Sequence, residues 1–203
     1  KAKHDEHRLV VQLPVIQKIS DILRQGDFKV TTTLARPVQS GRKTHIIHIQ
    51  PGDTTDRNYA VAVDVGTTTV YTQLVDLITG DVLAQFGDYN GQISYGEDII
   101  SRIIYAGKPG GLDKLHGVVI ANINKLIKKM VKKARIDPDE ISSITMAGNT
   151  TMTQLMLKVN PKYIRLSPYV PSSTLYPPIK AIELGIALGD HVTALVYPAI
   201  SSY

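Results

Sequence analysis

The sequence predicts a mixed α/β protein in which a small α+β segment precedes a larger α/β domain. Three short apolar runs between residues 59 and 86 are joined by tight turns, which is typical of an antiparallel meander of strands. Apolar residues at helical spacing over 112–135, followed by an apolar run over 141–147, then indicate an alternation of helix and strand.

The boundary between the two parts is predicted by a change in composition. Pro51–Thr55 is a run of turn-forming residues, so we expect a small unit over 1–57 and a larger unit over 58–203. The small unit is expected to contain one helix and two strands, at Val15–Gln25, Phe28–Leu34 and His45–Gln50.

The larger unit has a recognisable order of elements. Its expected strands are Tyr59–Val65, Val70–Leu77, Val82–Phe86, Ile141–Ala147 and His191–Pro198. Its helices are expected after Ser94 and Glu97, which have capping-box spacing, over 112–135 and over 150–158. The order β-β-β-α-β-α-β is that of the ribonuclease-H-like fold, the half-domain that is duplicated in actin-like ATPases.

The amino-acid composition excludes several kinds of functional site. The 203 residues contain no cysteine, which excludes disulfides, thiolate nucleophiles and cysteine-ligated zinc or iron–sulfur clusters within this stretch. No apolar run reaches the roughly 18 residues that a membrane span needs. The first residues are polar and lack the apolar core of a secretory signal, so a cytoplasmic location is expected and no membrane partner.

The net charge of +5 is concentrated in one helix. Its basic residues are Lys125, Lys128, Lys129, Lys132, Lys133 and Arg135. One reading is a solvated helix face, whose last-turn cations also suit the helix dipole. The other reading is a docking surface for an acidic partner. Nucleic-acid binding is not expected, because no aromatic residues interleave with the basic run.

The strongest functional signal is Asp64-Val65-Gly66-Thr67-Thr68-Thr69, where the first strand of the larger unit ends. Glycine allows backbone N–H groups to approach a phosphate closely, and successive N–H groups in a tight turn form an anion-binding nest. Threonine hydroxyls add donors, and a neighbouring aspartate can hold Mg²⁺ through water. The alternative reading is a β-hairpin in which Gly66 supplies the turn and the threonines serve strand propensity.

Several further blocks follow this motif in the chain. They are Tyr95–Ile103 (YGEDIISRI), Met146–Met152 (MAGNTTM), Asn160–Arg165 (NPKYIR) and Pro168–Pro171 (PYVP). Together with Asn58–Val70 (NYAVAVDVGTTTV), they resemble the ATP-dependent reductive activators of corrinoid proteins, a family of the actin-like superfamily. The resemblance covers most of residues 51–203 and keeps the order of the blocks.

The resemblance implies a role for each site residue. Asp64 and Asn149 would be catalytic: Asp64 would lie near Mg²⁺, with water between them, and Asn149 would orient water rather than take its proton. The cofactor-binding residues would be Gly66, Thr67, Thr68, Thr69, Gly148, Thr150 and Thr151. The first four would wrap the terminal phosphates of ATP, and the others would lie near the γ-phosphate.

Polar residues between the blocks also match positions of the family. Asn90, Gln92 and Asp98 lie in the loop and helix after the third strand of the larger unit. Asp98 and Arg102 are four residues apart on one helix, so the simplest reading is that they pair with each other.

The family couples ATP to the return of a corrinoid protein from Co(II) to Co(I), with an electron from an iron–sulfur cluster in a ferredoxin-like domain. By this comparison, residues 1–57 are a shortened middle or linker domain, and residues 58–203 are the first half of the actin-like ATPase domain. The redox domain and the second half of the ATPase domain would lie outside the chain. The implied cofactors are ATP and Mg²⁺, and the implied partner is a corrinoid protein. Whether the protein forms a homodimer is left open by the sequence.

Two other functions stay open at this point. A small-molecule kinase of the same superfamily would act on a sugar or a carboxylate, and it would need a base close to the acceptor hydroxyl. A non-enzymatic scaffold or dimerisation module would use the fold without nucleotide.

Overall fold

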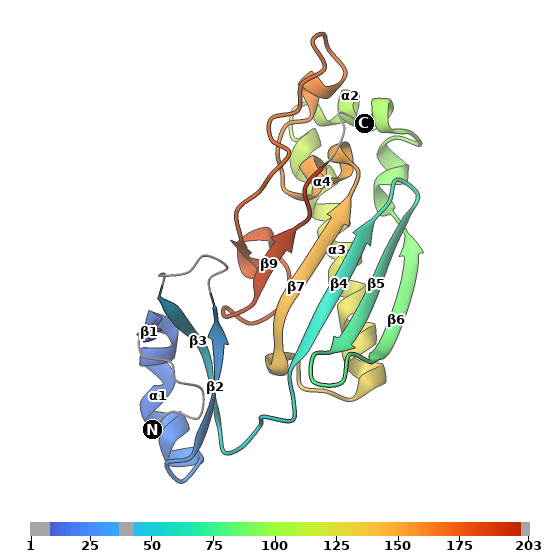
Figure 1. Ribbon diagram of the computed structural model, residues 1–203. Helices are drawn as coiled ribbons and strands as arrows, with labels where there is room; N and C mark the ends of the chain where they lie inside the picture. Colours follow the sequence, from blue (N-terminus) through green and yellow to red (C-terminus); the bar gives the residue numbers. More distant parts are fainter. Residues whose placement is uncertain (1–8, 37–42, 200–203) are drawn as a thin grey trace. The chain divides into compact units, whose positions relative to one another are not determined.

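The computed structural model describes residues 9–36 and 43–199 (Figure 1). The chain forms two compact units, Lys1–Arg57 and Asn58–Tyr203. The Pro-, Gly- and Ser-rich sequence from Pro37 to Lys43 predicts a turn or loop, and most of it lies outside the described residues.

The smaller unit is a three-stranded sheet with one helix. Its elements are β1 (Leu9–Val11), α1 (Leu13–Gln25), β2 (Val30–Ala35) and β3 (Thr44–Pro51). The strand order is β1-β3-β2, with β1 parallel and β2 antiparallel to the central β3. α1 packs against β3, buries Val15 and has Gly26 as its C-cap. The predicted helix is confirmed, with a start two residues earlier than expected.

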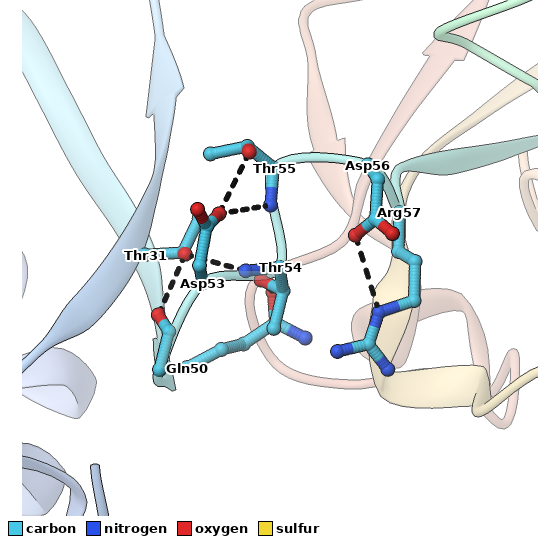
Figure 2. Close-up of polar contacts among 8 residues, drawn as sticks. Thr31, Gln50, Asp53, Thr54, Thr55, Asp56 and Arg57 are labelled. Atoms are coloured by element: carbon cyan, nitrogen blue, oxygen red, sulfur yellow. Dashed lines mark hydrogen bonds and ion pairs between the residues drawn. The ribbon is translucent and has the colours of Figure 1, made fainter.

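The turn after β3 is fastened to the sheet of this unit by side-chain hydrogen bonds (Figure 2). The Thr31 hydroxyl of β2 donates to the Gly52 carbonyl over 2.9 Å and accepts from the Thr54 N–H over 2.8 Å. The Asp53 carboxylate accepts from both the N–H and the hydroxyl of Thr55. These bonds satisfy polar groups that an irregular segment would otherwise leave without partners.

The larger unit is built on a six-stranded sheet. Its strands are β4 (Tyr59–Val65), β5 (Thr69–Asp76), β6 (Val82–Tyr89), β7 (Ile141–Gly148), β8 (Ile179–Lys180) and β9 (Thr193–Val196). Its α-helices are α2 (Ile99–Ala106), α3 (Gly111–Ala134) and α4 (Thr150–Met156), and its 3-10 helices are η1 (Gly91–Tyr95), η2 (Pro138–Glu140), η3 (Lys162–Ile164) and η4 (Ala181–Leu184).

The strand order of this sheet is β6-β5-β4-β7-β9-β8. β4, β5 and β6 form an antiparallel meander, whereas β7 and β9 run parallel to β4 on its other side. An antiparallel meander that continues into parallel strands through helical connections is the arrangement of the ribonuclease-H-like fold. The predicted fold class is therefore confirmed.

α3 covers one face of this sheet and supplies much of the core (Figure 1). The apolar stripe that the sequence predicts on this helix is buried, which confirms it: Leu115, Val119, Ile123, Leu126, Ile127 and Met130. Facing them are the inward residues of β4 and β5, among them Val61, Val63 and Leu74. No helix among the described residues, α3 included, is long and apolar enough to cross a membrane.

The start of α2 differs from the sequence prediction. Ser94 lies in η1 rather than at a helix cap, and the capping box is formed by Asp98 and Ser101. The Asp98 carboxylate accepts from the Ser101 N–H over 2.8 Å, while the Ser101 hydroxyl lies 3.2 Å from the Asp98 N–H. Gly96, between the two candidate caps, lets the chain pass close to α2, because a Cβ there would lie 2.8 Å from the Arg102 backbone nitrogen.

The contribution of α3 to the core can be measured by truncation. Leu126 is fully buried, so Leu126→Ala is expected to lower the free energy of unfolding by about 2–5 kcal/mol, through lost transfer energy and a residual cavity. The control is Leu77→Ala, at a side chain that is 46% exposed, for which a change below about 1 kcal/mol is expected. Urea denaturation followed by circular dichroism measures both, and equal losses would contradict this account of the core.

Candidate functional site

The turn between β4 and β5 lies at the end of the sheet where β7 also ends (Figure 1). Parallel pairing of β4 with β7 places Asp64 beside Ala147 and Val65 beside Gly148. Gly148 allows this approach, because a Cβ on it would lie 2.8 Å from the Val65 carbonyl oxygen. The two segments that the sequence singled out, 66–69 and 148–151, are therefore neighbours.

Three successive carbonyl groups of the turn are held by donors from the neighbouring elements. The Asn90 side-chain amide donates to the Gly66 carbonyl over 2.9 Å, and the Asn90 N–H donates to the Thr68 carbonyl over 2.8 Å. Between them, the Arg102 guanidinium donates to the Thr67 carbonyl over 2.6 Å. Asn90 and Arg102 are fully buried, so these carbonyl groups point toward the protein interior.

The N–H groups of the same turn are left available. In a planar trans peptide the N–H points opposite to the C=O, so the N–H groups of Thr67 and Thr68 face away from Asn90 and Arg102. Within the described part of the chain, no hydrogen bond uses either of them. Two adjacent free N–H groups in a tight turn form the kind of concavity that binds anions.

Gly66 gives the turn its tight form. Its N–H donates to the Thr69 carbonyl over 2.9 Å, and a Cβ on Gly66 would lie 2.8 Å from that same oxygen. Thr68 and Thr69 are exposed and Thr67 is half-buried, so threonine side chains remain at the surface around the free N–H groups.

Asp64 faces away from the core. Along β4 the valines at 61, 63 and 65 are buried, and strand alternation places the Asp64 carboxylate on the opposite, open face of the sheet. There it lines a hollow of about 240 Å³ together with Tyr71 and Tyr197. Among the described residues, Asp64 takes part in no ion pair or side-chain hydrogen bond, so its oxygens are free for another ligand.

Asn149 joins the second segment to the turn. Its side-chain amide donates to the Thr67 hydroxyl over 3.3 Å, and its side-chain oxygen accepts from the Met152 N–H over 2.9 Å, which caps α4. Thr150 and Thr151 lie inward in the first turn of α4 and are at most 1% exposed. The structure thus brings Asn149 to the turn, whereas it leaves the two threonine side chains buried.

Arg102 does not pair with Asp98, which the simplest reading of their spacing predicted. Asp98 caps α2, and the hydrogen bond from the Ser101 N–H is the main reason that the pKa of its carboxyl lies below the ordinary value. Arg102 turns inward and also donates from Nε to the Gly96 carbonyl over 2.8 Å. Burial lowers the pKa of the guanidinium, and the charge of Asp98 opposes that shift only in part.

A signal for the buried position of Arg102 was present in the sequence. Ile99, Ile103 and Ala106 follow each other at helical spacing, and Arg102 lies three residues after the first of them, on the same face of α2. The apolar periodicity of the helix therefore predicts that the arginine points inward. The four-residue spacing from Asp98 favoured the other reading, an ion pair at the helix surface.

The residues at the turn fit Mg²⁺ and a phosphate-bearing nucleotide. Two free N–H groups and surface hydroxyls suit phosphate oxygens, and an unpaired exposed carboxylate suits a hydrated Mg²⁺ ion. An iron–sulfur cluster does not fit these residues, because the chain has no cysteine to hold it.

The strand order and the helical connections give the larger unit the ribonuclease-H-like fold, with an anion-binding type of turn at the end of β4. Residues 59–203 match the profile of the RACo middle region, and residues 1–56 match that of the RACo linker region. The chain therefore belongs to the RACo family.

Two relatives are named after corrinoid activation. The corrinoid activation enzyme RamQ of Eubacterium limosum is 33% identical over 146 residues, which are 71% of this chain and 25% of RamQ. The solved structure of a reductive activator for a corrinoid iron–sulfur protein superposes with a TM-score of 0.87 at 37% identity, over 100% of this chain and 32% of that one. The chain thus spans a quarter to a third of the length of these relatives.

The close approach within the turn predicts the effect of adding one methyl group. Gly66→Ala is expected to destabilise the protein by about 1–3 kcal/mol, because the new Cβ would press on the Thr69 carbonyl. Gly117→Ala is the matched control: it lies in α3 with nothing within 4 Å of its Cβ and is expected to stabilise by about 0.5–1 kcal/mol. Urea denaturation measures both, and a neutral Gly66→Ala would contradict the tight turn.

Proposed function

We propose that the unit 58–203 is the first half of an actin-like ATPase domain and that its β4–β5 turn binds the terminal phosphates of Mg·ATP. The observation that carries this proposal is the orientation of the turn, with its carbonyls bound inside and the N–H groups of Thr67 and Thr68 free outside. The unpaired carboxylate of Asp64, on the adjacent strand end, supports it further.

Each residue of the site has a role in this proposal. Asp64 holds Mg²⁺ through water, and Asn149, which already contacts the Thr67 hydroxyl, orients the attacking water. The phosphate-binding residues are Gly66, Thr67, Thr68, Thr69, Gly148, Thr150 and Thr151. Of these, Thr67 and Thr68 act through their free backbone N–H groups, and Thr68 and Thr69 act through exposed hydroxyls. Gly66 and Gly148 allow the close backbone approaches, and Thr150 and Thr151 act by shaping the first turn of α4.

We further propose that ATP turnover at this site serves the reductive activation of a corrinoid protein. Membership of the RACo family and the names of the two relatives support it. In the reaction, Co(II) takes up one electron and becomes Co(I), while ATP is hydrolysed to ADP and phosphate. The electron comes from an iron–sulfur cluster held outside these cysteine-free residues, and residues 1–57 act as the linker.

The proposed location of the protein is the cytoplasm.

The lysines of α3 are the candidate surface for the corrinoid partner. Three of them have partners within the chain: Lys125 donates to Asp88 over 2.7 Å, and Lys129 and Lys133 lie over the Phe86 ring. Lys128 and Lys132 are exposed, and among the described residues they form no ion pair. Part of the basic run is therefore a solvated helix face, and the rest is free to attract an acidic surface.

The role of Asp64 is tested by its removal. Asp64→Ala is expected to abolish Mg-dependent ATP turnover in the full-length protein and leave the fold intact, because the side chain is exposed and forms no internal contact that the fold needs. The control is Asp81→Ala, at an exposed carboxylate of the β5–β6 connection, which is expected to keep full turnover. Phosphate release and circular dichroism are the measurements, and unchanged turnover in Asp64→Ala would remove this role.

The partner surface is tested by charge. Changing the five lysines from Lys125 to Lys133 to glutamine is expected to weaken the complex with the corrinoid protein about tenfold at low salt, with the difference shrinking as salt is added. The matched control changes the same five lysines to arginine, which keeps the charge and is expected to keep the affinity. Surface plasmon resonance measures the affinities. If the glutamine variant bound the corrinoid protein as tightly as the wild type, the basic run would be a solvated helix face and not a docking surface.

A further inference from the structure

Arg102 carries a buried positive charge that the Asp98 carboxylate, the cap of α2, stabilises only in part and without a salt bridge among the described residues. Its side chain is fully buried, and among the described residues it forms no ion pair. Its acceptors are the Thr67 and Gly96 carbonyls, the Gln92 side-chain oxygen at 3.4 Å and the Met152 sulfur at 3.2 Å. All four are neutral. A buried charge is costly unless it is paired, so its retention here calls for a reason.

Through its hydrogen bond to the Thr67 carbonyl, the charge of Arg102 acts on a peptide group of the turn. The Thr67 carbonyl and the Thr68 N–H belong to one planar peptide group, so a cationic donor on the oxygen polarises the N–H on the other side. The Asn90 amide acts in the same way on the peptide between Gly66 and Thr67. Of these two donors only Arg102 is charged, and charge-assisted hydrogen bonds are roughly twice as strong as neutral ones.

We propose that Arg102 is the positioning residue of the phosphate turn: it holds the Thr67–Thr68 peptide with its N–H outward and supplies the positive charge that a bound polyphosphate balances. This rests on the proposed function of the turn. Arg102 does not itself touch the ligand, because its guanidinium lies behind the turn and is fully buried. It acts through the Thr68 N–H, and in the low-dielectric interior its charge is screened less than a surface charge.

The same side chain links the turn to α4. Its Nη1 group contacts the Met152 sulfur, and the Met152 N–H donates to Asn149, whose amide donates to the Thr67 hydroxyl. Arg102 therefore lies beneath both segments that the site comprises, the β4–β5 turn and the start of α4. A neutral side chain of similar length fills part of that space but supplies neither the charge nor the forked donors.

The test compares two ways of removing the charge. Arg102→Met removes it with the hydrogen bonds, and Gln92→Glu keeps Arg102 but places a carboxylate where the Gln92 oxygen now accepts from it. Both are expected to weaken binding of Mg·ATP and of Mg·tripolyphosphate by about tenfold or more, whereas Arg102→Lys, which retains the charge, is expected to lose less. The matched control is Gln17→Glu, the same change at an exposed position of α1.

The readouts separate this role from a purely structural one. Isothermal titration calorimetry gives the affinities, and amide spectra of the ¹⁵N-labelled chain show whether each variant is folded. Binding within twofold of the wild type by a folded Arg102→Met or Gln92→Glu protein would overturn the proposal. If neither variant folds, the test is made on the wild type. Saturation with Mg·ATP is expected to shift the Thr68 amide and the Arg102 Nε–H resonances, and the absence of both shifts would overturn the proposal.

Failure of the proposed function looks different. In that case the wild-type full-length protein binds neither Mg·ATP nor Mg·tripolyphosphate, or its Asp64→Ala variant binds Mg·ATP as tightly as the wild type. If the wild type binds, Asp64→Ala does not, and the Arg102 and Gln92 variants bind normally, then the phosphate turn stands and only the role of Arg102 falls.

Discussion

The capture of three successive carbonyls by Asn90 and Arg102 is the constraint on which the site depends. A tight turn between two strands can present either its carbonyls or its N–H groups to solvent, and the choice decides whether it attracts cations or anions. Here two buried residues, Asn90 directly after β6 and Arg102 in α2, bind the carbonyls from inside. The anion-binding character of the turn is therefore fixed by residues more than twenty positions further along the chain.

The sheet topology places the other parts of the site around this turn. Parallel pairing of β7 with β4 puts Gly148 beside Val65, so that Asn149 is within reach of Thr67. Strand alternation directs Val63 and Val65 into the core and leaves Asp64 on the open face. The carboxylate and the free N–H groups thus come from one short stretch, and the carboxylate reaches solvent because the core holds the valines on either side of it.

Local signals predicted most of the fold and drew attention to the β4–β5 turn. Apolar periodicity located α3 and β4 within one residue, and the glycine–threonine motif marked the turn beside Asp64, whose role stays a prediction. The sequence could not show what the inward side of the turn binds, because Asn90 and Arg102 reach it through tertiary packing. The prediction that Arg102 pairs with Asp98 was wrong, because the Asp98 carboxylate caps α2 instead.

Burial of Arg102 is explained better by the turn than by the stability of the core. An apolar side chain on that face of α2 would pack against Met152 without the cost of removing a charge from water. What it could not do is hold the Thr67 peptide in one orientation and polarise its N–H group. A buried charge that costs stability and holds the Thr68 N–H group outward is expected where that N–H group binds an anion. The buried arginine and the free Thr68 N–H group therefore support the same interpretation from opposite sides of one peptide.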